Sequence, residues 1–219
     1  MRAKWRRVAL FVAGLAILSP LAAPRLLAFP YSTRVGRHRV YAEAQIDHHI
    51  MKVVEEADRR LRTSPIGTSR PADQDIFLTS GQWRWTWLSL PNRAAFAVSR
   101  PFAETIVVNL SDTRADVVRN GASIAGARSL SGTLAHEMTH GAIRAHFGVS
   151  ADWRSPAELR EGYCDHVAGG GSLKDEKARA LASSGKTVPA VLYWRGRKKV
   201  EAALAVNGGN VDGLFENWR

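Results

Sequence analysis

The feature that most constrains this chain is the run T-L-A-H-E-M-T-H-G-A at residues 133–142, which contains the pattern H-E-x-x-H. Apolar residues at helical spacing predict a helix here, namely Leu130, Leu134, Met138 and Ala142. On that helix His136 and His140 lie on one face about one turn apart, so both imidazoles can bind one zinc ion. Glu137, beside the first histidine, can then accept a proton from a water molecule.

A second segment supplies a third ligand. Residues 156–168 read P-A-E-L-R-E-G-Y-C-D-H-V-A. If this segment is helical, Glu161 and Asp165 share one face. Glu161 can complete a His2Glu set, which catalytic zinc sites use with one open position. Asp165 can accept a hydrogen bond from the outer nitrogen of a ligand histidine and so fix its tautomer.

These two segments together resemble the gluzincin (thermolysin-like) zinc metallopeptidases, in particular small bacterial ones, over about 35 of the 219 residues. The matching residues are His136, Glu137, His140, Glu161 and Asp165. The resemblance implies one zinc ion per chain and hydrolysis of a peptide or protein substrate. It implies an α+β, zincin-like fold with a small mixed sheet, an active-site helix and a C-terminal helical part.

Two further roles are implied by the resemblance. Gluzincins stabilise the oxyanion with a Tyr or His from the C-terminal part, and Tyr193 or Tyr163 are the candidates here. Members of the family also pair an extended substrate with an edge strand just before the active-site helix. The segment 105–110 is the candidate, with Thr105, Val107 and Asn109 as substrate-binding residues. No acidic site for a substrate amino terminus is recognisable, which favours an endopeptidase.

The rest of the chain predicts a helix, then strands, then helices. Expected helices cover 42–62, 173–183 and 188–206, and expected strands cover 38–41, 75–80, 95–99 and 104–110. Residues 82–90, Q-W-R-W-T-W-L-S-L, alternate and predict an extended segment with its tryptophans on one side. Those tryptophans either pack inward or form a surface for peptide, glycan or membrane. Residues 111–128 predict a loop near the cleft.

Other residues compete for the metal or stand near it. His146 and His166 would point away from His140 and Glu161 respectively on continuous helices. His48 and His49 fit solvent-facing positions better than ligands. Cys164, the only cysteine, excludes an intramolecular disulfide and either packs as a small apolar residue or contributes to the zinc site.

The N-terminus has the layout of a signal sequence or membrane anchor. Residues 1–7 are basic and residues 8–18 are an uninterrupted apolar run. We assign residues 1–29 to a signal peptide or anchor, with residues 8–29 as the possible membrane segment, and 30–219 to one metallopeptidase domain. The basic end stays in the cytoplasm, so the domain is expected to be exported, periplasmic or otherwise extracytoplasmic.

The charge does not indicate a nucleic-acid partner. The formal net charge of +11 falls to +6 without residues 1–28. The remaining cations are scattered apart from the run at 195–199, which fits a solvated face better than a binding patch, and no nucleic-acid motif accompanies it.

An alternative of another class stays open. H-E-x-x-H also occurs by chance on helices with surface histidines. The chain could then be a non-catalytic, exported or membrane-anchored zincin-fold module that binds membrane, cell wall or a partner protein through its tryptophans and basic run.

Overall fold

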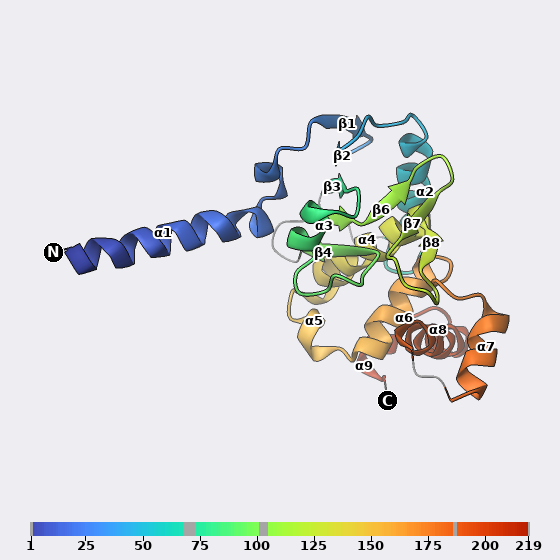
Figure 1. Ribbon diagram of the computed structural model, residues 1–219. Coiled ribbons are helices and arrows are strands. Elements are labelled where there is room, and N and C mark those ends of the chain that lie inside the picture. Colours follow the sequence, from blue (N-terminus) through green and yellow to red (C-terminus); the bar gives the residue numbers. More distant parts are fainter. Residues whose placement is uncertain (1, 68–72, 101–104, 186–187, 219) are drawn as a thin grey trace.

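The computed structural model describes residues 2–67, 73–100, 105–185 and 188–218. In these residues the chain is a mixed α+β structure around a small mixed sheet, which confirms the predicted class (Figure 1). The helices are α1 Arg2–Ala22, η1 Pro24–Leu27, α2 Ile50–Arg62, α3 Trp83–Leu88, α4 Leu130–Phe147, α5 Ala151–Arg154, α6 Ala157–Val167, α7 Asp175–Ser183, α8 Pro189–Val206 and α9 Val211–Glu216. The strands are β1 Tyr31–Val35, β2 His38–Ala42, β3 Asp75–Leu78, β4 Ala97–Arg100, β5 Thr105–Val108, β6 Leu110–Asp112, β7 Val117–Arg119 and β8 Ala127–Ser129.

The main sheet has the order β1-β2-β3-β5-β4 among the described strands. Strands β2, β3 and β5 run parallel, and β1 and β4 are antiparallel at the two edges. The central strands of such a sheet are covered on both faces, which explains the apolar runs at residues 76–78 of β3 and 106–108 of β5. The burial of every residue of β5 follows from this.

The prediction of a substrate-binding edge strand at 105–110 is wrong. Strand β4 runs back along β5 and occupies its outer side, pairing Val98 with Val107. Thr105 and Val107 are therefore buried, and the side chain of Asn109 bonds to Ala95 and Leu110 inside the fold. The edge strand next to α4 is β4 itself.

Alternate residues of the sheet face two different layers, as the period of a strand requires. On β3 and β5, Ile76 and Ile106 join the core beneath α2 and α4. Phe77 and Val107 point the other way, into a smaller core formed with α3 and the segment after α1. The sheet therefore separates the H-E-x-x-H helix from α3.

The tryptophan-rich segment is helical, so the prediction of an extended segment is wrong. In α3, Trp85 and Leu88 are three residues apart and both buried against the sheet. In a run as short as residues 82–90, alternating apolar residues also fit the three-residue spacing of a helix face. Trp83 is left 57% exposed.

The expected loop at 111–128 instead contains a second sheet, β6-β7-β8, which leads directly into α4. The expected helix at 42–62 begins only at Ile50, because β2 extends to Ala42. The helices expected at 173–183 and 188–206 are present as α7 and α8.

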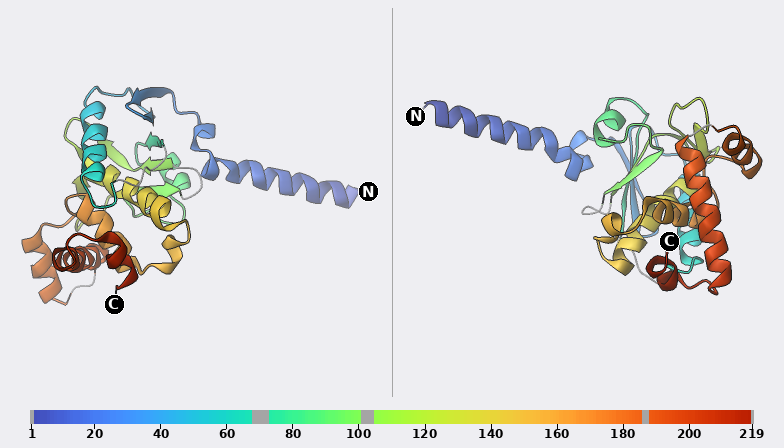
Figure 2. Two further views of the ribbon diagram at one scale, coloured as in Figure 1. Left: turned by 180° about the vertical axis from the view of Figure 1, so that it is seen from behind. Right: turned by 90° about the horizontal axis from the view of Figure 1, so that it is seen from below.

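Helix α1 projects away from the body in every view (Figures 1 and 2). Among the described residues it is the one helix long and apolar enough to cross a membrane. Only 6% of its apolar stretch, Trp5–Ala22, is buried against the rest of the protein. Its length and composition suit a signal sequence and a membrane anchor alike. The folded body begins before residue 30, because Leu27 and Phe29 pack into the core beside α3.

We expect Phe29→Ala to lower the free energy of unfolding by about 1–3 kcal/mol, because a half-buried ring is removed from the small core. The Phe29 ring lies edge-on to Phe77 with centroids 5.0 Å apart. Leu26 is 62% exposed, so Leu26→Ala should change stability by no more than about 0.5 kcal/mol. Urea unfolding of the full chain in detergent micelles measures both, and equal effects would contradict the packing described.

Candidate metal centre

Helix α4 carries the H-E-x-x-H residues through the middle of the molecule, and all its residues from Leu130 to Arg144 are buried. Its N-terminus is capped by Ser129, whose side chain accepts a hydrogen bond from the Gly132 amide. The carboxylate of Asp116 accepts hydrogen bonds from the Ser131 amide at 2.7 Å and from the Ser129 and Ser131 hydroxyls. A negative charge at this end also suits the helix dipole. Both contacts fix where α4 starts.

Helix α6 packs on α4 and carries Glu161 and Asp165. It packs closely on α8 through two glycines: a Cβ at Gly162 would lie 2.4 Å from the carbonyl carbon of Gly196. A Cβ at Gly196 would lie 2.5 Å from the carbonyl oxygen of Glu158. Only glycine permits this approach, so the crossing of α6 and α8 is set by these two positions.

Both histidines lie close to the same oxygen of Glu161. One carboxylate oxygen of Glu161, Oε2, lies 3.2 Å from Nε2 of His136 and 3.6 Å from Nε2 of His140. Zinc bonds of 2.0–2.2 Å at tetrahedral angles separate neighbouring ligand atoms by about 3.3–3.5 Å. The observed separations lie on either side of that range. The other oxygen of Glu161 is 3.6 Å from Nε of Arg160.

The outer nitrogen of each histidine has its own partner. Nδ1 of His136 is 2.8 Å from Oδ1 of Asp165, the contact expected from the sequence spacing. Nδ1 of His140 is 3.5 Å from the sulfur of Cys164. When Nδ1 donates these hydrogen bonds, Nε2 of both rings is left with a free lone pair toward Glu161.

Arg128 supports the Asp165 carboxylate from β8. Its Nη2 lies 3.1 Å from Oδ1 of Asp165 and donates a second hydrogen bond to the Gly170 carbonyl, also at 3.1 Å. Both side chains of this ion pair are almost fully buried. Burial alone would raise the pKa of Asp165, but the charge of Arg128 and the hydrogen bond with His136 outweigh it and hold the pKa low.

Asp165 and Glu161, which both hydrogen-bond to His136, also determine the protonation of its ring. Burial alone would lower the pKa of His136, but hydrogen bonds to Asp165 and Glu161 outweigh it and raise the pKa to about 10. Burial alone would raise the pKa of Glu161. The charge of His140 and the hydrogen bond from His136 outweigh burial and hold the pKa of Glu161 well below its usual range. Without a metal the site therefore holds a proton between imidazole and carboxylate, which a divalent cation would displace.

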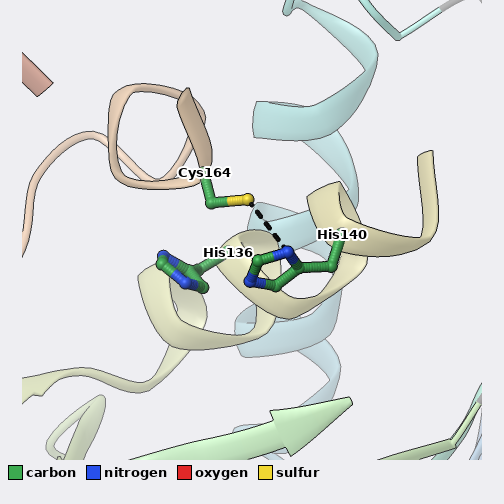
Figure 3. A group of neighbouring side chains, drawn as sticks. All are labelled: His136, His140 and Cys164. Atoms are coloured by element: carbon green, nitrogen blue, oxygen red, sulfur yellow. Dashed lines mark hydrogen bonds between the residues drawn. The ribbon is translucent and has the colours of Figure 1, made fainter. Parts of the chain in front are cut away.

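Cys164 offers a second donor set, because ligand atoms of His136, His140 and Cys164 lie within 4.8 Å of one another (Figure 3). The thiol contacts Nδ1 of His140, whereas Glu161 contacts Nε2 of both rings. Burial, and then the charges of Glu161, Glu137 and Asp165, raise the pKa of Cys164 and oppose the thiolate that zinc requires. The His2Glu set therefore fits zinc better, with Cys164 positioning His140.

Tyr193 lies near the same group of carboxylates. Its pKa is raised by burial and then by the charges of Glu161 and Asp165, with a smaller contribution from Glu137. The residue is still 39% exposed. Tyr163, the other candidate, is fully buried and its hydroxyl accepts a hydrogen bond from the Ile66 amide at 3.2 Å, away from the two histidines.

The competing histidines have other partners. His146 lies 2.6 Å from Asp212 of α9, and the ring of His166 lies beside that of Tyr163, with centroids 6.1 Å apart. A second group of possible ligands, Asp47, His48 and His49, is a run of consecutive surface residues. Arg114 already binds its carboxylate, with Nε 2.6 Å from Oδ2 of Asp47. We place no metal there.

Sequence reasoning missed the residues that support the site from a distance. Arg128, Asp116 and the glycine pair Gly162 and Gly196 carry no motif of their own. A glycine within each of two predicted helices was the one available signal, since an interior glycine destabilises a helix unless close packing requires it.

No protein-family model, curated protein or solved structure matches this chain. The site is therefore defined by its geometry.

We expect Asp165→Asn to weaken zinc binding about 10–100-fold, because the amide holds the His136 tautomer less firmly than the carboxylate does. Competition with a chromophoric chelator measures the affinity. Asp152→Asn is the matched control, because Asp152 pairs with Arg144 at 3.4 Å and not with a histidine of the site. Equal affinities for Asp165→Asn and the unmodified protein would contradict the assigned role.

Cobalt(II) substitution separates the two donor sets. We expect a spectrum without the strong near-ultraviolet absorption of a thiolate-to-cobalt bond, because Glu161 and not Cys164 is the third ligand. Cys164→Ala should retain stoichiometric metal, whereas Glu161→Ala should lose most of it. Thiolate absorption that disappears in Cys164→Ala would show that the His2Cys set is the correct one.

Proposed function

We propose that this chain is a zinc-dependent peptidase of zincin-like fold that acts outside the cytoplasm. The observation that carries the proposal is that one oxygen of Glu161 lies within 3.6 Å of Nε2 of both His136 and His140, with Glu137 on the same helix as the histidines. Three protein donors leave a fourth position for water or substrate, as catalytic zinc sites do.

Zinc held by these three residues would polarise a scissile carbonyl and acidify a water molecule. Glu137 is the general base: it follows His136 directly, it is 7% exposed, and its charge reaches both Tyr193 and Cys164. A carboxylate there takes the proton of the attacking water and passes it to the leaving nitrogen. Tyr193, which is within range of the charges of Glu161 and Glu137, is the candidate donor of a hydrogen bond to the developing oxyanion.

The substrate backbone would add to strand β4. This strand pairs with β5 on one side, and the structure describes no strand on its other side. An open edge offers unpaired N–H and C=O groups to an extended peptide. Because β4 packs beside α4, a peptide added there would run past the histidines, in place of one bound by Thr105, Val107 and Asn109.

Glu137→Gln tests the proposal. We expect it to keep zinc, because Glu137 is not one of the three donors, and to lower kcat about 10²–10⁴-fold, because the base is lost. Zinc content is read by mass spectrometry of the metal, and hydrolysis by release of fluorescent peptides from labelled casein.

Glu158→Gln is the matched control, since Glu158 pairs with Lys199 at 2.8 Å on an exposed part of α6. Hydrolysis by Glu137→Gln at the rate of Glu158→Gln would refute the mechanism. A protein that takes up no zinc after reconstitution would refute the proposal as a whole.

A further inference from the structure

Two tryptophans of α3 lie against the end of the apolar helix α1. Trp83 and Trp87 line an open pocket of about 590 Å³ together with α1 residues Ala16, Ile17 and Pro20. The lining is almost wholly apolar, its other members being Leu27 and Thr86. Trp83 is 57% exposed, which is unusual for so large an apolar ring beside an apolar groove.

The position of the pocket along α1 sets its depth in a membrane. The apolar window Trp5–Ala22 has 18 residues, which span about 27 Å against about 30 Å for the hydrocarbon core. Ile17 precedes the end of the helix by five residues, or about 8 Å. Side chains that share a pocket with Ile17 and Pro20 therefore lie at the boundary of the bilayer whenever α1 crosses it.

Helix α3 is tied to the segment that follows α1, at the end of η1. Arg84 donates hydrogen bonds to the carbonyls of Leu27 at 2.9 Å and Ala28 at 3.2 Å, and its guanidinium lies 4.6 Å from the centre of the Trp83 ring. Trp85 holds the other side of α3 in the sheet core, with Nε1 donating to the Arg93 carbonyl at 3.0 Å. Helix α3 therefore cannot move far from Leu27 and Ala28, the segment just after α1, without breaking these contacts.

The chemistry around α3 suits phospholipid. Tryptophan prefers the region between headgroups and acyl chains, where its ring is in an apolar layer and its N–H stays hydrated. The side chain of Arg25, which follows α1, is 59% exposed and lies 3.6 Å from Asp75, and its remaining donors face the level of the phosphates. Trp5, 72% exposed, stands at the opposite end of the same helix.

We propose that α3 is a membrane-interface helix, whose Trp83 and Trp87 insert into the outer leaflet while α1 spans the bilayer, with phospholipid acyl chain filling the groove between them. The basic residues in the first two turns of α1, Arg2, Lys4, Arg6 and Arg7, stay on the cytoplasmic side. The sheet then lies between the lipid-facing layer and α4, which holds the metal centre one layer away from the membrane. This proposal does not depend on catalysis.

Fluorescence quenching by spin-labelled lipid tests it. The full chain is synthesised without cells, directly into phosphatidylcholine nanodiscs, so that no peptidase removes α1. All proteins carry Trp5→Phe, which leaves six of the seven tryptophans and removes the one within α1. The nitroxide is placed either near the lipid carbonyls or at the end of the acyl chain.

We expect the shallow nitroxide to quench the parent protein more than the deep one. Trp83→Phe with Trp87→Phe should lose most of that quenching, and Trp83→Phe alone, at an exposed position, should lose part of it without affecting the fold. Trp153→Phe is the control, because Trp153 is 69% exposed but belongs to α5. Equal quenching in the double variant and the parent, no quenching in the parent, or stronger quenching by the deep nitroxide would each overturn the proposal.

Discussion

The buried ion pair between Arg128 and Asp165 is the contact on which the site depends. A carboxylate removed from water is costly unless charge and hydrogen bonds compensate it. Asp165 receives that compensation from Arg128 on one side and His136 on the other. The same carboxylate therefore joins the second sheet, α6 and α4 at one point. By binding Nδ1 of His136, Asp165 also directs Nε2 of that ring toward Glu161. One carboxylate therefore both joins these elements and orients a candidate metal ligand.

The sheet divides the molecule into two layers with different roles. On one face α4 lies in the larger core, where α6 packs on it and carries Glu161, and α8 packs on α6 in turn. On the other face Phe77 and Val107 pack with α3 and the segment that leaves α1. Because strand side chains alternate between faces, neighbouring residues of β3 serve both layers. The proposed membrane attachment on one face and the candidate metal centre on the other therefore use different side chains.

Local patterns predicted the elements near the metal centre well and the strand pairing poorly. Apolar spacing and the i, i+4 placement of His136 and His140 define a helix with both rings on one face, and the same spacing relates Glu161 to Asp165. These signals are short-range, so the sequence contains them in full. The edge position assigned to Thr105, Val107 and Asn109 was wrong because strand order depends on where β4 returns, which no local pattern encodes. The helical form of Trp83–Leu88 was missed because alternation and helical spacing coincide over six residues.

The sequence by itself determined the donor atoms available for a metal, the helices that carry them and the apolar N-terminal segment. These follow from residue type and from spacing within one element. Only the tertiary structure decided which nitrogen of each histidine faces Glu161, that Cys164 stands behind His140, and that Tyr193 rather than Tyr163 lies near the carboxylates. Those outcomes depend on the crossing of α6 and α8 at Gly162 and Gly196 and on the burial of Arg128, which are contacts between residues far apart in the chain. Contacts between such distant residues form only when the helices and sheets pack together, so no local sequence pattern predicts them.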